Sequence, residues 1–197
     1  MSKKGVFICI EGLDGSGKTT QAQILAEKLS ETYPSFFTAE PSHGKTGAFI
    51  RESCLYEQKR LPTATEALLF AADRVEHVEN EIKPALSEGK IVICDRYVYS
   101  SFAYQGSAGL SLDWIKKINE FALVPDLAFF IDVVPERVLE RLQRRKSVME
   151  TLEIQRKVSE VYLEFVNRGE LFRINGDRPK GVVADELLAK VLRKMKG

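Results

Sequence analysis

Short apolar runs alternate along the chain with longer segments of helical periodicity. The runs from Gly5 to Ile10 and Ile91 to Cys94 are continuously apolar, which is typical of strands buried on both faces of a sheet, and Leu127 to Val133 repeats the pattern and ends at Asp132. Shorter strands are predicted at 36–39 and 171–174, and helices at 19–29, 46–59, 63–86 and 182–195, with further helices beginning near Pro135 and Glu150. This alternation predicts an α/β fold with a parallel sheet covered on both faces.

Acidic residues lie at or directly after the ends of four predicted strands. They are Glu11, Glu40, Asp95 and Asp132. Parallel strands end at the same edge of a sheet, and ligands of open α/β sheets bind beyond that edge. We therefore expect these carboxylates to line a binding site.

A glycine-rich loop joins the first predicted strand to the first predicted helix. Residues 12–19 read Gly-Leu-Asp-Gly-Ser-Gly-Lys-Thr and match the phosphate-binding pattern G-x-x-x-x-G-K-[ST] in its required context. In such a P-loop, backbone N–H groups converge on phosphate oxygens, and the helix start adds partial positive charge. The alternative is a glycine turn that merely caps a helix.

The P-loop pattern assigns a role to each polar residue. Lys18 is predicted to reach the β- and γ-phosphates of ATP, and Thr19 to offer its hydroxyl to Mg²⁺. Asp95, at the end of a neighbouring strand, is predicted to hold that ion through its water shell. The expected ATP site comprises Gly12, Leu13, Asp14, Gly15, Ser16, Gly17, Lys18, Thr19 and Thr20.

Composition favours one enzyme domain over residues 1–197 with small-molecule substrates. Hydrophobic residues make up 44%, and 29 Lys plus Arg balance 28 Asp plus Glu, so net charge does not favour a nucleic acid or membrane partner. No apolar run approaches the roughly 20 residues of a membrane span, and no signal sequence precedes the first strand, so we expect a cytoplasmic protein. The three cysteines lack metal-ligand spacing and are expected to be reduced core thiols.

Sequence motifs of several other P-loop classes are missing. The chain has no Asn-Lys-x-Asp for guanine recognition and no Leu-Ser-Gly-Gly-Gln. Arg96 follows Asp95 at the position where many ATPases carry a glutamate that polarises water. These features favour a transferase over a hydrolase.

Four stretches, in their order and spacing, resemble the thymidylate kinases. They are 11–21 (Glu-Gly-Leu-Asp-Gly-Ser-Gly-Lys-Thr-Thr-Gln), Glu40-Pro41 with Gly47 and Ile50-Arg51, Phe70-Ala-Ala-Asp-Arg74, and 95–105 (Asp-Arg-Tyr-Val-Tyr-Ser-Ser-Phe-Ala-Tyr-Gln). The resemblance covers nearly the whole chain. It implies conversion of ATP and dTMP to ADP and dTDP by a homodimer, on a three-layer α/β/α fold of the P-loop NTPase type with a five-stranded parallel sheet and a short lid.

The resemblance also implies a dTMP site. Arg96 and Arg51 are candidates for the dTMP phosphate, because a guanidinium fork matches phosphate oxygens; the alternative for Arg51 is a surface helix charge. By the same resemblance Phe70 stacks on thymine and Arg74 donates to its carbonyl oxygen, although core packing is the alternative for Phe70 alone. Phe70 and Arg74 are four residues apart, so they share one helix face.

The remaining members of the implied dTMP site are Glu11, Glu40, Ser101, Tyr104 and Gln105. Ser101 and Gln105 complete the base pocket, and Tyr104 lies beneath the sugar and excludes a 2′-hydroxyl. Glu11 is a candidate both for the 3′-hydroxyl and for the magnesium shell. Neither histidine, His43 or His77, is assigned a chemical role.

A basic run predicts a lid at 141–150. Some members of the family carry an arginine in the P-loop where this chain has Gly15, and others supply the cation from a lid. Arg144 and Arg145 therefore join Lys18, Asp95 and Arg96 as candidate catalytic residues, against the alternative of a solvated helix face. The family's usual lid sequence Asp-Arg-x-Glu reads Ser-Val-Met-Glu at 147–150, so the acting arginine stays open.

Two rival functions stay open at this point. One is a kinase for another nucleoside monophosphate, such as dUMP or CMP, or for unphosphorylated thymidine, whose hydroxyl would need a general base. The other is an ATP-binding P-loop module without turnover. The second phosphate-and-base constellation of Phe70, Arg74, Arg96 and Tyr104 argues against such a module.

Overall fold

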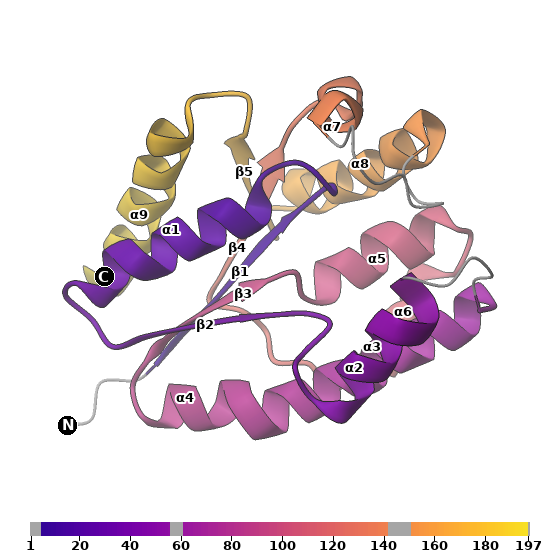
Figure 1. The fold of residues 1–197 in the computed structure, drawn as a ribbon, viewed down its shortest axis with the longest axis horizontal. Helices are drawn as coiled ribbons and strands as arrows, with labels where there is room; N and C mark the ends of the chain where they lie inside the picture. Colours follow the sequence, from indigo (N-terminus) through magenta and orange to yellow (C-terminus); the bar gives the residue numbers. More distant parts are fainter. Residues whose placement is uncertain (1–4, 56–60, 142–150, 197) are drawn as a thin grey trace.

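One five-stranded sheet organises the molecule. The computed structural model describes residues 5–55, 61–141 and 151–196. In them the strands run parallel in the order β2-β3-β1-β4-β5 (Figure 1). The strands are β1 (Val6–Gly12), β2 (Ser35–Ala39), β3 (Ile91–Asp95), β4 (Leu127–Asp132) and β5 (Phe172–Asn175). The predicted α/β fold class and parallel sheet are confirmed.

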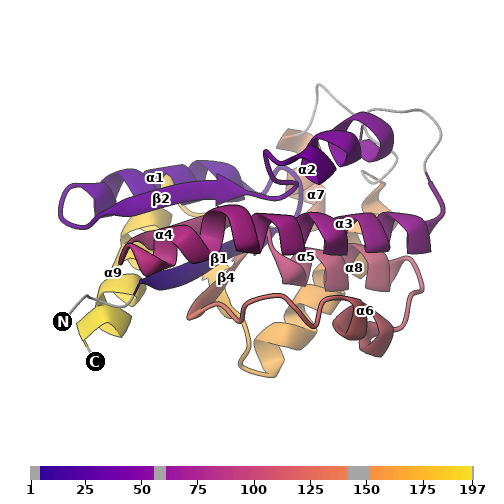
Figure 2. The ribbon, with the colours of Figure 1, turned by 90° about the horizontal axis from the view of Figure 1, so that it is seen from below.

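Helices cover both faces of the sheet. Helices α1 (Lys18–Ser30) and α9 (Lys180–Lys196) pack together on one face, and α4 (Lys83–Ser87), α5 (Val98–Ser107) and α8 (Leu152–Asn167) lie against the other (Figures 1 and 2). The remaining helices are α2 (Lys45–Ile50), α3 (Thr63–His77), α6 (Leu112–Ile118) and α7 (Pro135–Arg141). The three layers match the predicted arrangement.

Strand register aligns the carboxyl ends of the strands. Asp95 of β3 is level with Ile10 of β1 and Ala39 of β2, and on the other side Gly12 is level with Ile131 of β4. The four predicted strand-end carboxylates therefore share one edge, as expected. The strands themselves supply the centre of the core, because β3 is buried at every position and β1 at all but its first.

The three cysteines are buried. Cys9 and Cys94 are register partners on β1 and β3, and Cys54 lies in the helical segment after α2. This confirms the expectation of core thiols. Within the described ranges, no helix combines the length and apolar character needed to cross a bilayer.

The predicted helices at 46–59 and 63–86 are both interrupted by π-helical turns. The first becomes α2 followed by a π turn at Arg51–Leu55, and residues 56–59 lie outside the described part. The second becomes α3, a π turn at Val78–Ile82, and α4. Pro84 explains this second interruption, since it has no N–H to donate and its ring displaces the carbonyl four residues earlier.

Candidate active site

The P-loop has the conformation that its sequence predicts. Gly17 precedes α1 with φ of 91°, a left-handed conformation that strongly favours glycine. Gly12, at the end of β1, packs so closely that a Cβ there would lie 2.6 Å from Ser16 Oγ. A larger residue at Gly12 would therefore require the Ser16 side chain to move. The loop therefore presents its backbone and the first turn of α1 at the carboxyl edge.

Asp14 of the P-loop contacts two cations from different elements. Its carboxylate lies 3.3 Å from Lys18 Nζ and 2.6 Å from Arg96 Nη2. Burial raises the pKa of Asp14, but the charges of Arg96 and Lys18 outweigh burial and hold that pKa well below its ordinary range. Burial and the neighbouring Arg96 lower the pKa of Lys18. The structure thus brings two predicted catalytic cations together at one carboxylate.

Thr19 and Asp95 form the pair predicted to hold magnesium. Thr19 Oγ1 donates to Asp95 Oδ2 at 2.5 Å. The other oxygen of Asp95 is buried and has no hydrogen-bond partner among the described residues. A hydroxyl beside a carboxylate with a buried oxygen to spare is a donor set that suits a hydrated Mg²⁺ ion. The residues present therefore fit the metal.

Arg96 is fixed from both its backbone and its side chain. Its φ of 66° lies in the left-handed region, which non-glycine residues seldom adopt outside sites that the surrounding structure strongly constrains. Its guanidinium donates to Ser100 Oγ at 2.9 Å and Tyr104 Oη at 3.2 Å, and lies 5.0 Å over the Tyr104 ring. Charge attraction to Asp14 raises its pKa against the effect of burial. Arg96 is therefore a preoriented cation at the sheet edge.

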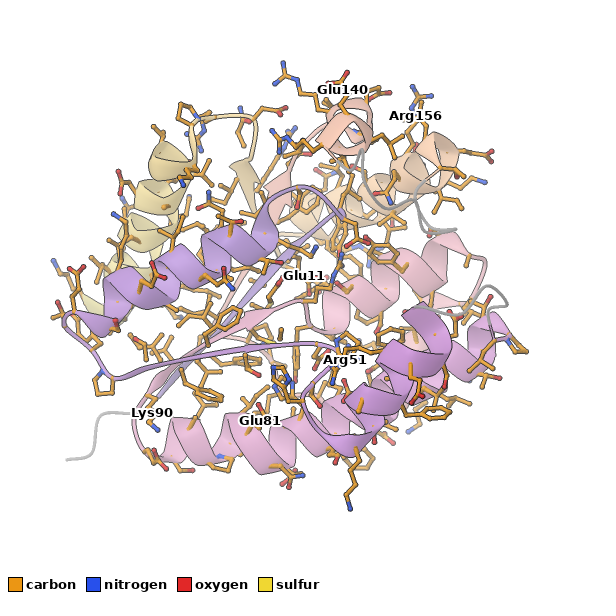
Figure 3. All side chains as sticks on the ribbon, viewed as in Figure 1. Glu11, Arg51, Glu81, Lys90, Glu140 and Arg156 are labelled. Atoms are coloured by element: carbon orange, nitrogen blue, oxygen red, sulfur yellow. The ribbon has the colours of Figure 1, made fainter. Side chains whose placement is uncertain are left out.

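Glu11 is a buried carboxylate with three hydrogen-bond donors around it. It accepts from the Tyr97 N–H at 2.9 Å, Ser100 Oγ at 2.6 Å and Tyr162 Oη at 3.2 Å. Burial raises the pKa of Glu11, although the hydrogen bonds from Ser100 and Tyr97 and the charge of Arg96 oppose the shift. Figure 3 shows Glu11 near the centre of the molecule, whereas the labelled Glu140 and Arg156 lie at its periphery on α7 and α8. Glu11 therefore joins β1 to the start of α5 and to α8.

Arg74 is the centre of a buried polar cluster. Its guanidinium donates to Glu40 Oε2 at 3.0 Å from Nε and 2.5 Å from Nη2. Its Nη1 donates to Ser101 Oγ at 3.2 Å and to Asn119 Oδ1 at 2.5 Å. His77 Nδ1 lies 3.3 Å from Glu40 Oε1, which links a histidine without an assigned role to the cluster. Arg74 and Ser101 thus meet as predicted, and Glu40 contacts Arg74.

The other predicted base-site residues lie one helical turn away from this cluster. Phe70 precedes Arg74 by four residues on α3 and is half-buried. Gln105 follows Ser101 by four residues on α5, and its Oε1 is buried with no partner among the described residues. The structure therefore presents a ring, a guanidinium and a free amide oxygen from two packed helices.

Arg51 is positioned by backbone carbonyls. Its Nη1 donates to Pro41 O at 2.8 Å and to Ser42 O at 2.6 Å. Figure 3 shows Arg51 beside α2, near the turn that follows β2. Arg51 is thus an oriented, partly buried side chain, and a freely solvated surface charge does not describe it.

The candidate lid begins where the described part of α7 ends. Arg141 donates to Ser16 O in the P-loop at 3.5 Å and to Asp177 at 3.4 Å, so α7 reaches the phosphate loop. Arg144 and Arg145, with the rest of 142–150, lie outside the described residues. Their predicted catalytic role stays a prediction.

Three residues that contact predicted site residues, Ser100, Asn119 and Tyr162, are not themselves among the predicted site residues. Ser100 lies inside the stretch at 95–105 that carries the resemblance, so its involvement was open to inference. Asn119 and Tyr162 reach the site from α6 and α8 across long sequence separations, and no local pattern marks them. A cavity of about 650 Å³ between α5, α6 and α8 includes Asn119 in its wall but none of the predicted site residues.

Comparisons with known proteins agree with this geometry. The family model for thymidylate kinase matches residues 10–187. The chain is 43% identical over 203 residues to a probable thymidylate kinase of Pyrococcus abyssi, covering 98% of this chain and 99% of the relative. It is 46% identical over 179 residues to a probable thymidylate kinase of Pyrococcus horikoshii (87% of each chain) and 45% identical over 163 residues to one of Methanococcus aeolicus (82% and 79%). The chain therefore belongs to the thymidylate kinase family.

Proposed function

We propose that this chain transfers the γ-phosphoryl group of ATP to dTMP, forming ADP and dTDP, at the carboxyl edge of the sheet. The meeting of Lys18 and Arg96 at Asp14 carries the proposal. Transfer between two nucleotides brings two polyanions together, so cations from the donor side and the acceptor side must converge. Lys18 belongs to the ATP loop and Arg96 to the junction of β3 and α5, and they converge at this point.

The acceptor requires orientation and charge neutralisation, and it requires no general base. A phosphate monoester has its second ionisation near pH 6, so dTMP is already a nucleophilic dianion at neutral pH. We assign Lys18 to the β- and γ-phosphates of ATP, and Arg96 and Arg51 to the dTMP phosphate. The fixed guanidinium groups of both arginines support this assignment, because less side-chain freedom is lost on binding.

Thr19 and Asp95 would hold the magnesium ion that accompanies ATP in this family. The ion, when bound, neutralises charge on the β- and γ-phosphate oxygens. The contact between Thr19 and Asp95, and the spare buried oxygen of Asp95, support the assignment. Asp95 would hold the ion through water molecules of its hydration shell.

The base pocket suits thymine because it offers both a donor and an acceptor. Glu40, Ser101 and Asn119 accept from four of the five N–H groups of Arg74, so we assign the remaining one, on Nη2, to a carbonyl oxygen of the base. Phe70 supplies an aromatic face. The partnerless Oε1 of Gln105 can accept the N3–H of thymine. Cytosine has no hydrogen at N3, so it would leave this buried oxygen unsatisfied, which costs about 1–3 kcal/mol. The pocket therefore supports thymine or uracil over cytosine.

The sugar is assigned to Tyr104 and Glu11. The Tyr104 hydroxyl is held between Arg96 and Asp14, at 3.2 Å and 3.3 Å, where it can block a 2′-hydroxyl. Glu11 contacts Tyr97, Ser100 and Tyr162, whereas Thr19 and Asp95 contact each other. This arrangement supports a place for Glu11 on the acceptor side. Glu40 serves that side by holding Arg74.

The lid, the oligomeric state and the location complete the proposal. Arg144 or Arg145 would supply a further cation during closure, and the contact of Arg141 with Ser16 supports a lid anchored near the P-loop. Phe49 of α2 and Leu68 of α3 are about half exposed (48% and 50%) on packed helices, which supports a homodimer. The buried free thiols of Cys9 and Cys94 support a reducing, cytoplasmic location.

The first experiment measures ADP formation from Mg·ATP on adding dTMP, with thymidine, dUMP and CMP in parallel. We expect turnover with dTMP, weaker turnover with dUMP, and none with thymidine or CMP. Preference for another monophosphate would keep the phosphoryl-transfer mechanism and overturn the base assignment. Turnover of thymidine would contradict a mechanism without a base. ATP binding with no phosphorylated acceptor would favour a non-catalytic module.

A further inference from the structure

Two neighbouring residues of α3 bind the two ends of the turn that follows β2. Arg74 binds the carboxylate of Glu40, at the start of the turn. Asp73 binds Ser42, at its end: Oδ2 accepts the Ser42 N–H at 2.8 Å and Oδ1 accepts the Ser42 hydroxyl at 2.6 Å. The 40–42 turn is therefore fastened to one helix at both ends.

The same turn orients Arg51. Ser42 uses its N–H and hydroxyl for Asp73, and its carbonyl, with that of Pro41, accepts from Arg51 Nη1. Gly47 of α2 packs onto this junction so tightly that a Cβ would lie 2.1 Å from Ser42 O and 2.8 Å from Asp73 Oδ1. A shift of Ser42 would therefore move the carbonyls that aim Arg51.

A buried carboxylate at this place is costly, and its cost points to a role. Asp73 and Ser42 are both 0% exposed. Burial raises the pKa of Asp73, against the lowering effect of its two hydrogen bonds from Ser42. A buried carboxylate that is stabilised mainly by hydrogen bonds from a serine adds little to the stability of the fold, since apolar side chains of similar volume would stabilise it as well. What the carboxylate does provide is a two-point hold on the backbone and hydroxyl of one residue.

We propose that Asp73 is a positioning residue for the acceptor phosphate, acting through Ser42 to aim Arg51. The inference rests on the proposed function, because it requires Arg51 to bind the dTMP phosphate. Arg74 and Asp73 then act on different parts of dTMP. Arg74 binds the base directly, and Asp73 fixes the distance between Arg51, which binds the phosphate, and the base site. One helix turn thereby matches the site to the length of a nucleoside monophosphate.

The test compares two ligands that differ only in the phosphate. Affinities for dTMP and for thymidine are measured by calorimetry for wild type, Asp73→Asn, Ser42→Ala and Arg51→Gln, with thermal unfolding alongside. The asparagine keeps the size of the side chain, but its NH2 group would face one of the two Ser42 donors, so one hydrogen bond is lost. We expect Asp73→Asn to weaken dTMP binding by about tenfold or more and thymidine binding by less than about twofold. The KM for ATP is expected to stay unchanged.

A double-mutant cycle tests whether Asp73 affects dTMP affinity through Arg51. If Asp73 acts through Arg51, Asp73→Asn adds no further loss of dTMP affinity in the Arg51→Gln background. Asp126→Asn is the matched control, since Asp126 also accepts a backbone N–H, that of Phe7 at 2.9 Å, but lies before β4 at the opposite edge of the sheet. This control is expected to change neither affinity.

Equal weakening of dTMP and thymidine, or additive losses in the cycle, would overturn the inference and leave Asp73 a structural residue. If Asp73→Asn does not fold, Ser42→Ala carries the same test, because it removes one hydroxyl and keeps the backbone contact. It is expected to show the same selective loss at about threefold. A wild-type protein that binds thymidine but gains nothing from the phosphate of dTMP would refute the proposed function as well.

Discussion

The carboxylate of Asp14 lies 2.6 Å from Arg96 Nη2, so a residue of the P-loop binds the cation that we assign to the dTMP phosphate. The same carboxylate contacts Lys18 at 3.3 Å. Without Asp14 the buried Lys18 and the partly buried Arg96 would repel each other across the loop. The ion pair therefore keeps the site assembled when no phosphate neutralises them.

Asp14→Asn is expected to lower the melting temperature of the ligand-free protein. Because the pKa of Asp14 is depressed in the folded state, its contribution to stability is present above the unfolded value of about 3.9 and is lost as the pH falls below it. Mg·ATP should stabilise the variant more than the wild type, since phosphate replaces the missing charge. Calorimetric melting with and without Mg·ATP at pH 7 checks this. An equal ATP-induced shift in both proteins would contradict it.

Asp95→Asn is expected to raise the magnesium concentration that gives half-maximal rate by about 10- to 100-fold. The reason is the loss of the carboxylate charge beside Thr19, whereas the P-loop contacts with ATP persist. The measurement is a magnesium titration of turnover at saturating ATP and dTMP. Asp132→Asn is the control, because Asp132 also ends a strand at this edge but pairs with Arg173. The metal assignment fails if both variants respond alike.

Glu11→Gln is expected to stabilise the protein at neutral pH and to impair turnover. The pKa of Glu11 is raised in the folded state, so the stability that the protonated carboxyl supports is present below the unfolded value of about 4.3 and declines as the pH rises through the folded value. The variant should therefore melt higher at pH 7, by about 2–4 °C for each kcal/mol gained, with the difference shrinking toward pH 4.

Turnover of Glu11→Gln with dTMP should fall by about tenfold or more, because the carboxylate is proposed to face the sugar. Melting curves from pH 4 to 8, with rates at pH 7, check both parts. A variant that is less stable than the wild type throughout that range would show that the hydrogen bonds of Glu11 outweigh its burial.

Arg74→Met is expected to destabilise the protein by about 3–5 kcal/mol, because it leaves the carboxylate of Glu40 buried without its cation. Adding Glu40→Gln should restore much of that loss, but dTMP affinity should stay low since no donor faces the base. Urea unfolding and dTMP binding of the two single variants and the double variant test this prediction. Recovery of affinity together with stability would remove Arg74 from base recognition.

The sequence predicts those parts of this protein that are marked by local patterns, such as apolar runs and motif spacing. Continuous apolar runs such as Ile91–Asp95 identify buried parallel strands, and the spacing of the P-loop fixes the places of Lys18 and Thr19. The helices α5 and α6 were not delimited by pattern, because the stretch after Asp95 is rich in aromatic and serine residues with weak helical periodicity. The π turn before Pro84 was missed for a related reason: a helix broken at proline keeps its apolar stripe.

The connections within the site were less accessible to sequence reasoning. Tyr162 contacts Glu11 only because α8 packs across α5, and Asn119 reaches Arg74 from the end of α6. Such contacts depend on how helices stack on the sheet, which no window of sequence reports. The family resemblance supplied the residues that we assign to substrate. The contacts of Asp73 with Ser42, and of Ser42 with Arg51, could be found only in the three-dimensional structure.

The central position of β1 has a consequence for synthesis of the chain. This strand is made first, yet both of its partners, β3 beginning at Ile91 and β4 beginning at Leu127, are made much later. Pairing over such separations is slow and closes long loops. A nascent chain therefore carries its complete phosphate loop well before either partner strand of β1 exists. We expect nucleotide binding to begin only when β4 has left the ribosome. ATP would then bind and stabilise only chains in which β1 has both of its neighbouring strands.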